Sequence, residues 1–383
     1  MVNEERLTNL FCDFVRIDSV SRNEKAVSEK IQEMLKEFDA EVLIDDSTEK
    51  TGSNTGNLVV KIKGNVDAPP MILSGHMDTV EPGEGIIPVL KDGVFSSEGE
   101  TILGSDDKSA LAIIFEILTV LKENDLKHGP LELVITVCEE IGLIGAKHLD
   151  YSLIDSRFGY VLDSTDTEGV VTRAPYAYRF EFKVHGKASH AGAAPENGIN
   201  AITVAATAVA QIKTGRLDSE TTCNIGKIEG GIATNIVPPL AVVTGEARGH
   251  DKAKLDKVMD SIIFAFEKAV NDGREDGSAL PMLEVSLDTD FPGTNIPNDH
   301  DVVTFAKQAA ANLGIEMKTK TIGGGSDANI FFEKGIVAGV IGTGMTDVHT
   351  VNETIKLSDM VRNASLILEI IKLHAENGPA IKK

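Results

Sequence analysis

The segment LELVITVCEE at residues 131–140 shows the pattern that decides the fold: a mainly apolar run that ends in two acidic residues. The same pattern recurs in MILSGHMD at residues 71–78 and in FGYVLDSTD at residues 158–166. Short apolar runs of this kind predict strands, and they alternate with helix-like segments such as residues 109–122. Strands that alternate with helices predict an α/β fold with parallel strands in its sheet.

A different pattern occupies the middle of the chain. The segment YRFEFKVHGK at residues 178–187 alternates apolar and polar side chains, as a strand with one solvent-exposed face does. A predicted helix at residues 198–214 follows, then two strand-like segments, a predicted helix at residues 252–270 and a last strand. This β-α-β-β-α-β order predicts a compact α+β domain of the ferredoxin-like type, inserted into the larger α/β domain.

The length of 383 residues favours two domains over one. We expect the larger domain at residues 1–175 and 291–383, because the α/β pattern resumes after the insertion. The inserted domain is expected at residues 176–290.

The formal net charge of −22 argues against two classes of partner. A strongly acidic surface repels phosphate backbones and anionic membranes, so we expect no nucleic-acid partner and no membrane partner. No apolar run reaches the roughly 18–20 residues of a membrane span, and the N-terminal segment lacks the apolar core of a secretion signal. The three cysteines, Cys12, Cys138 and Cys223, have no CxxC spacing and fit a reducing compartment. We therefore expect a cytoplasmic protein.

Acidic and histidine residues gather where the apolar runs end or where the next helix begins. In open α/β sheets this edge binds ligands, because the loops that follow the strands converge there. Carboxylates and imidazoles from five separate loops form a mixed oxygen and nitrogen ligand set, which suits Zn²⁺, with Mn²⁺ or Co²⁺ as substitutes. The five groups are His76 with Asp78, Asp106 with Asp107, Glu139 with Glu140, Asp163, and His349.

Within these groups the spacing suggests a division of roles. In an extended segment His76 and Asp78 point the same way, so Asp78 can hydrogen-bond one imidazole nitrogen while the other nitrogen binds metal. The adjacent Glu139 and Glu140 face apart, so one can bind metal while the other stays free as a base. Asp106, at a junction between strand and helix, can offer one oxygen to each of two ions.

Five ordered motifs, SGHMDTV, LGSDDKSA, VCEEIG, LDSTD and DVHTVNE, resemble the metal motifs of the M20 metallopeptidases. In order and spacing they are most similar to the peptidase T (tripeptide aminopeptidase) branch, and the resemblance spans nearly the whole chain. It implies a mixed-sheet, zinc-aminopeptidase-like catalytic domain with an inserted lid and dimerisation domain. It also implies two Zn²⁺ per subunit, a short peptide substrate, and a cis peptide bond between Asp106 and Asp107.

The resemblance also assigns a role to each residue of the site. The implied metal ligands are His76, Asp106 and Asp163 for the first ion, and Asp106, Glu140 and His349 for the second. Asp78 would orient the first histidine. Glu139 would be the general base, which takes a proton from the attacking water and passes it to the leaving amine.

Three further segments resemble parts of the family's lid domain. GKASHAG resembles the segment whose histidine stabilises the tetrahedral oxyanion, often across a dimer, and it nominates His190. GGIATNIVP nominates Asn235, and GEARGHD nominates Arg248, as substrate-binding residues. A homodimer through the lid is expected, because one face of the predicted helix at residues 198–214 is rich in alanine and valine.

One position departs from the peptidase T pattern. That branch carries Arg in a stretch RGGTD, where it is expected to bind the terminal carboxylate of the peptide. Here the stretch reads GGGSD, with Gly323 in place of that Arg. A bidentate carboxylate clamp is therefore missing at this position, and strict tripeptide specificity is not implied.

Two other functions stay open. An M20 amidohydrolase or deacylase acting on N-acyl or N-carbamoyl amino acids would share all the metal ligands. A non-catalytic metal-binding or peptide-binding protein on the same scaffold is the alternative of another class, although an uncoordinated base would have no purpose there. Two lid residues also have structural alternatives: His190 packed against Pro195, and Arg248 paired with Glu246 or Asp251.

Overall fold

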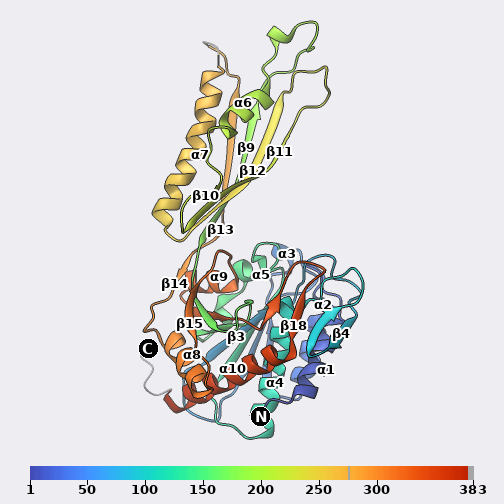
Figure 1. Cartoon of the computed structure of the whole chain (residues 1–383), viewed down its shortest axis with the longest axis vertical. Coiled ribbons are helices and arrows are strands. Elements are labelled where there is room, and N and C mark those ends of the chain that lie inside the picture. Colours follow the sequence, from blue (N-terminus) through green and yellow to red (C-terminus); the bar gives the residue numbers. More distant parts are fainter. Residues whose placement is uncertain (275–276, 378–383) are drawn as a thin grey trace. The chain divides into compact units, whose positions relative to one another are not determined.

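The structure, a computed structural model, describes residues 1–274 and 277–377. It divides the chain into two compact units, which we call unit 1 (residues 1–173 and 295–383) and unit 2 (residues 174–294). The sequence places these two divisions after residues 175 and 290. Figure 1 shows both units and labels many of their helices and strands. None of the helices in the described ranges is both long enough and apolar enough to cross a membrane.

Unit 1 is built on a nine-stranded sheet with the strand order β1-β2-β6-β3-β7-β16-β8-β14, in which β15 also pairs with β8. The central strands β6, β3, β7 and β16 run parallel, whereas β1 and β2 pair antiparallel. This mixed sheet confirms the predicted α/β class. The strands are β1 Ala40–Ile44, β2 Leu58–Ile62, β3 Met71–His76, β6 Leu131–Thr136, β7 Phe158–Val161, β8 Gly169–Ala174, β14 Thr294–Asn295, β15 Lys318–Thr321 and β16 Val337–Ile341.

The parallel strands explain how distant loops come together. β3 and β6 are buried along their whole length, which is why the sequence shows them as mainly apolar runs. Because β3, β6 and β7 are parallel neighbours, their carboxyl ends lie at one edge of the sheet. His76 ends β3, Glu139 follows β6 closely, and Asp163 follows β7 closely.

The main helices of unit 1 pack around α4 (Ser105–Glu123), which contacts β3 and lies against both α1 (Glu4–Val15) and α10 (Leu357–Asn377). The sequence predicts this helix only from residue 109. It begins earlier, and its first turn contains two residues with non-helical backbone angles, Asp106 and Asp107. The remaining helices are α2 Lys25–Leu35, α3 Thr48–Thr51, α5 Ile144–His148, α8 Asp301–Asn312 and α9 Asp327–Glu333, with a 3-10 turn at Tyr151–Leu153.

Unit 1 also contains a small four-stranded sheet, with the order β17-β18-β5-β4, that the sequence does not predict. Strands this short give no detectable periodicity. The loop between β17 and β18 carries His349. The strands are β4 Pro88–Lys91, β5 Val94–Ser97, β17 Met345–Thr346 and β18 Thr354–Lys356.

Unit 2 is an antiparallel sheet with the order β10-β11-β12-β9-β13, covered by α6 and α7. It has its own core, in which the rings of Phe182 and Phe266 stack at 4.3 Å. Apart from the short β10, the order of its elements is the predicted β-α-β-β-α-β. The elements are β9 Tyr176–His185, a 3-10 turn Pro195–Asn197, α6 Ala201–Val209, β10 Gly215–Arg216, β11 Thr221–Gly230, β12 Leu240–Gly249, α7 Lys252–Asp272 and β13 Met282–Phe291.

The prediction for α6 was wrong in two respects. The helix spans Ala201–Val209 rather than residues 198–214, because the residues before it form a β-bridge instead. The alanine face proposed for dimer contact is not available, since Ala201, Ala205 and Ala208 are fully buried in the core of unit 2. Alanines at this spacing lie on one face of a helix, and here that face packs against its own sheet.

Candidate active site

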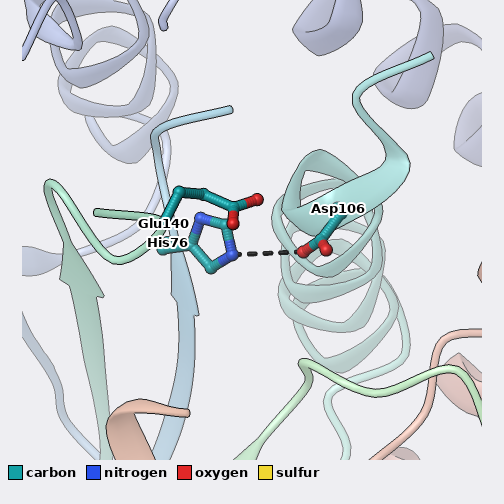
Figure 2. A group of neighbouring side chains, drawn as sticks. All are labelled: His76, Asp106 and Glu140. Atoms are coloured by element: carbon teal, nitrogen blue, oxygen red, sulfur yellow. Dashed lines mark hydrogen bonds and ion pairs between the residues drawn. The ribbon is translucent and has the colours of Figure 1, made fainter. Parts of the chain in front are cut away.

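His76, the last residue of β3, has a neighbour at both ring nitrogens. Its Nδ1 lies 2.9 Å from the backbone oxygen of Asp78 and 3.4 Å from the carboxylate of the same residue. Its Nε2 lies 3.2 Å from Oδ1 of Asp106, and Figure 2 shows the ring facing that carboxylate. A proton on Nδ1, donated to Asp78, leaves the Nε2 lone pair to face a metal. The closer contact of Asp78 with the imidazole is thus made by its backbone carbonyl oxygen, and the predicted contact through its carboxylate is longer.

Asp106 lies in the first turn of α4, and its two oxygens face two different imidazoles. Oδ1 lies 3.2 Å from His76 Nε2, and Oδ2 lies 3.2 Å from His349 Nε2. The peptide bond to Asp107 is cis, as the resemblance implies. Asp107 is fully buried and accepts a hydrogen bond from the His76 backbone N–H at 3.1 Å. Asp106 therefore has the arrangement that a bridging carboxylate requires.

The loop that carries Glu139 and Glu140 is held by side chains from other segments. Four consecutive backbone N–H groups at residues 137–140 donate hydrogen bonds of 2.9 to 3.2 Å: the first to Asn57, the second to Glu24, and the last two to Asp78. Because Asp78 also contacts His76, its carboxylate ties the two loops together. This arrangement fixes where both glutamates can point.

Glu140 and His349 come from different loops and meet directly. His349 Nε2 lies 2.9 Å from Oε2 of Glu140, and the histidine side chain is 50% exposed. Glu139 points to the other imidazole, with Oε2 4.0 Å from His76 Nε2. Glu140 thus contacts His349 directly, and it also belongs to the group of ligand atoms around His76 that lie within 4.8 Å of one another.

The ligand atoms form two overlapping groups. Atoms of His76, Asp106 and Glu140 lie within 4.8 Å of one another, and so do atoms of Asp106, Asp107 and Asp163. Figure 2 shows the first group. Asp106 belongs to both groups. The structure therefore brings the predicted metal ligands together at one edge of the sheet.

Two carboxylate oxygens test whether this cluster fits metal ions. Oε1 of Glu140 and Oδ1 of Asp107 are buried and have no hydrogen-bond partner within residues 1–274 and 277–377. A buried carboxylate oxygen without a donor is costly, whereas coordination to a divalent cation satisfies it. The oxygen-rich donors with two imidazoles match what Zn²⁺ binds at catalytic sites. The residues present thus fit a pair of metal ions.

The electrostatics of the site show a shortage of positive charge. Burial, together with the Asp106 carboxylate, raises the pKa of Asp163 to about 8. Burial also raises the pKa of Glu139 well above its usual range. Hydrogen bonds to Asp106 and Glu140 raise the pKa of His349 to about 10. The raised pKa values of the carboxylates show that negative charge is costly here, and the raised pKa of the histidine shows that positive charge is favoured. Added cations would therefore be stabilised at this place.

Three buried carboxylates near the site were not assigned a role from the sequence. Asp107 contacts the His76 backbone, as described above. Asp327, the first residue of α9, accepts a hydrogen bond from Thr136 at 2.5 Å, and burial raises its pKa to about 6. Glu353 holds the segment before Asp106. Glu353 lies within DVHTVNE and Asp327 within GGGSD, so position in a motif was the only available signal.

In unit 2, His190 and Asn235 lie on neighbouring chain segments, since Ala191 N–H donates to the backbone oxygen of Asn235 at 2.9 Å. Both residues are exposed. The His190 Nδ1 accepts hydrogen bonds from the backbone N–H groups of Gly192 and Ala193, at 3.2 and 3.1 Å. An Nδ1 that accepts cannot carry a proton, so the ring proton is on Nε2. His190 therefore presents a hydrogen-bond donor to its surroundings.

Arg248 and Gly323 are placed as follows. Arg248, on β12, donates to Glu246 at 3.0 Å, which is one of the pairings left open by the sequence, and its guanidinium lies over the ring of Phe291 at 5.6 Å. Gly323 follows β15, and a Cβ added there would meet no atom within 4 Å. Space for a larger side chain is therefore present where the peptidase T pattern has Arg.

Comparison with known proteins gives consistent results. The sequence profile of peptidase family M20/M25/M40 matches residues 72–373. The protein YqjE of Bacillus subtilis is 39% identical over 375 residues, which cover 97% of this chain and 99% of that protein.

Two solved structures are similar over nearly the whole chain. The aminopeptidase PepT from Bacillus cereus has a TM-score of 0.90 and 38% identity, covering 98% of this chain and 99% of that one. A tripeptidase from Staphylococcus aureus has a TM-score of 0.93 and 38% identity, covering 98% of this chain and 100% of that one.

Proposed function

Because this chain belongs to peptidase family M20/M25/M40, we propose that it is a dinuclear metal-dependent aminopeptidase that cleaves short peptides, in the manner of a tripeptidase. Its predicted membership of the M20 metallopeptidases is confirmed. The observation that carries the finer proposal is the position of Asp106 between His76 and His349. The names of the two similar structures, an aminopeptidase and a tripeptidase, support the substrate class.

The proposed metal centre holds two Zn²⁺ per subunit, with Mn²⁺ or Co²⁺ as substitutes. When bound, such a pair acidifies a water molecule and polarises the scissile carbonyl. Asp106 would be shared by both ions, because each of its two oxygens lies near a different histidine. The ligands assigned to the first ion are His76, Asp106 and Asp163, and those assigned to the second are Asp106, Glu140 and His349. Contacts of His349 with Asp106 and Glu140 support the second set. For the first set, the structure groups His76 with Asp106 and Glu140, and Asp163 with Asp106 and Asp107.

Glu139 is the proposed general base. It is 8% exposed, and its backbone N–H is fixed by Asp78 at 2.9 Å. Burial raises its pKa, which suits a carboxylate that must hold a proton between two steps. Glu139 takes the proton of the attacking water and then gives it to the amine that leaves, so it returns to its starting state in each cycle.

Residues of unit 2 are proposed to handle the substrate. The Nε2–H of His190 is the proposed donor to the tetrahedral oxyanion, and the two backbone N–H groups bound at Nδ1 support this tautomer. Asn235 and Arg248 are the proposed substrate-binding residues. The Glu246 carboxylate and the Phe291 ring hold the Arg248 guanidinium, so it would bind substrate with little loss of side-chain freedom.

We also propose a homodimer through unit 2. Its outer strand β13 exposes Met282, Val285 and Leu287, and α7 exposes Phe264 at 63%. An edge strand offers unpaired backbone groups to another chain, and exposed apolar side chains that gather on a surface mark interaction sites. Light scattering should find a dimer, and a fully active monomer would remove this part of the proposal.

Activity on paired substrates tests the proposal. The zinc-loaded protein should hydrolyse tripeptides with a free amino group and leave N-acetyl amino acids intact. Cleavage of only the blocked compounds would instead support the deacylase alternative.

The variant Glu139→Gln tests the chemistry itself. It should keep its zinc content and lose activity by about 10²–10⁴-fold, the usual contribution of a general base. A variant with unchanged kcat would contradict the role of Glu139. A wild-type protein that binds zinc and cleaves neither substrate class would support the non-catalytic alternative.

A further inference from the structure

Glu353 makes an unusual set of contacts in the wall of the candidate site. It is 1% exposed and follows His349 in the loop between β17 and β18. Its Oε2 accepts the backbone N–H groups of Leu103 and Gly104, each at 2.9 Å. Its Oε1 accepts the Ser105 hydroxyl at 2.5 Å and the Asp106 backbone N–H at 3.1 Å. One buried carboxylate thus binds four donors from four consecutive residues.

One of these contacts takes the place of a cap that α4 lacks, because the Asp106 N–H belongs to the first turn of the helix, whereas Leu103 and Gly104 precede that turn. The first N–H groups of a helix have no partner within the helix and are usually satisfied by the side chain of the N-cap residue. The N-cap of α4 is Gly104, which has no side chain and takes a left-handed conformation with φ of 71°. Glu353 supplies the missing acceptor from a distant part of the chain. Charge-assisted hydrogen bonds of this kind are about twice as strong as neutral ones.

The other end of this connection is His349. The turn from His349 to Glu353 has internal hydrogen bonds: Asn352 N–H donates to the Thr350 hydroxyl at 3.1 Å, and Glu353 N–H donates to the Thr350 carbonyl at 3.1 Å. The side chains at both ends of the turn therefore reach Asp106, one at its backbone N–H and one at its carboxylate.

We propose that Glu353 is a positioning residue that joins the bridging carboxylate and the histidine of the second metal into one unit. It holds the backbone of Asp106 while its own loop presents His349 to the Asp106 side chain. The second metal site forms only when the segment before α4 and the loop between β17 and β18 are held in the correct relative position. The affinity of this site for metal therefore depends on Glu353. This inference rests on the proposed dinuclear site.

Zinc titration of the full-length metal-free protein by calorimetry tests the inference. Glu353→Gln has nearly the same shape but only one acceptor oxygen, and its NH₂ group would face N–H donors. We expect one of the two zinc sites to lose about 10–100-fold in affinity, the usual cost of losing an outer-shell partner. The zinc concentration for half-maximal activity should rise by the same factor, with kcat recovering at high zinc.

Glu132 provides a matched control. It is also a buried glutamate of unit 1, 2% exposed, and it accepts backbone N–H groups of Asp155 and Ser156 at 3.0 and 2.8 Å. It lies near the start of β6, away from the edge that carries the site. Glu132→Gln should lower the melting temperature without moving the zinc dependence. An equal zinc shift in both variants would overturn the inference, because the effect would then be general destabilisation.

A milder variant guards against loss of folding. Ser105→Ala removes one of the four donors, and we expect a smaller zinc shift, of about two- to tenfold, in the same direction. Unchanged zinc affinities in both Glu353→Gln and Ser105→Ala would overturn the role of Glu353 while leaving the proposed function intact. A wild-type protein with fewer than two zinc sites would instead show that the dinuclear proposal itself has failed, and this inference with it.

Discussion

The acidic loops of unit 1 and the His190 loop of unit 2 are constructed in opposite ways. In unit 1, buried side chains bind the backbone of each loop that carries the Asp106 and Glu139 groups. In unit 2, His190 and Asn235 lie on exposed segments. This contrast separates two tasks. Metal ligands and a base must be held within a fraction of an ångström before substrate arrives, whereas substrate-binding groups can be ordered by the substrate itself.

The largest effect is expected from Asp106→Asn, which changes the carboxylate at the centre of the proposed metal site in unit 1. The amide offers one neutral oxygen where two charged oxygens face His76 and His349. Zinc content should fall, and kcat/KM should drop by at least about 10³-fold, since metal polarisation contributes several kcal/mol to the barrier reduction. Elemental analysis and tripeptide hydrolysis measure both quantities.

A surface aspartate serves as the control for this variant. Asp155 forms an exposed ion pair with Lys61 at 2.6 Å, so Asp155→Asn should leave zinc content and rate close to those of the wild type. An Asp106→Asn protein with two zinc ions and normal turnover would show that this carboxylate does not bridge the metals.

The next largest effect is expected in unit 2. His190→Ala should retain both zinc ions and lose about 10²–10³-fold in kcat, the usual cost of removing one oxyanion donor. The matched control is His185→Ala, a surface histidine of the same unit that contacts Glu284 at 3.2 Å. If both variants keep wild-type kcat, unit 2 contributes no oxyanion donor at this position.

Mixing two inactive variants shows which subunit supplies the donor. In a homodimer with His190 acting across the interface, a mixed dimer of His190→Ala and Glu139→Gln subunits contains one complete site. Equal mixing should then restore about one quarter of the wild-type activity, because half of the dimers are mixed. If no activity returns although subunits exchange, His190 acts within its own chain.

The same contrast explains what could be predicted from the sequence. The strands β3, β6 and β7 are visible as apolar runs because both their faces are buried, and their order places the acidic residues at one edge. The family motifs then indicated the metal-ligand set, and membership of the family is confirmed.

Other features could not be read from the sequence because they depend on contacts between distant segments. Glu353 binds donors some 250 residues earlier in the chain, and no local pattern indicates such a bond. The alanine face of α6 was misassigned because an apolar helix stripe looks the same whether it packs on its own sheet or on a partner. Strands β17 and β18 are too short to produce a period.

The smallest expected effect is on the pH dependence of stability, and it comes from a comparison of two buried histidines of unit 1. His76 is surrounded by carboxylates. Burial lowers its pKa, but hydrogen bonds to Asp106 and Asp78 outweigh burial and raise the pKa well above its ordinary value. His374, on α10, is fully buried beside the rings of Phe158 and Phe305, and burial lowers its pKa from 6.5 to about 4. Burial alone therefore gives an uncharged imidazole.

This difference predicts a specific pH dependence of stability. The pKa of His374 is lower in the folded protein than in the unfolded chain, so the unfolded chain binds a proton first as the pH falls. The contribution of this residue to stability is therefore complete above pH 6.5 and is lost as the pH falls from 6.5 towards 4. At pH 5 the loss from His374 is about 2 kcal/mol. Urea unfolding of metal-free protein at pH 8 and pH 5 measures it. His374→Leu, which cannot be protonated, should lose about 2 kcal/mol less than the wild type between these values. Equal losses would mean that the folded protein protonates His374 as readily as the unfolded chain does, and that burial beside the two phenylalanine rings does not keep this imidazole uncharged.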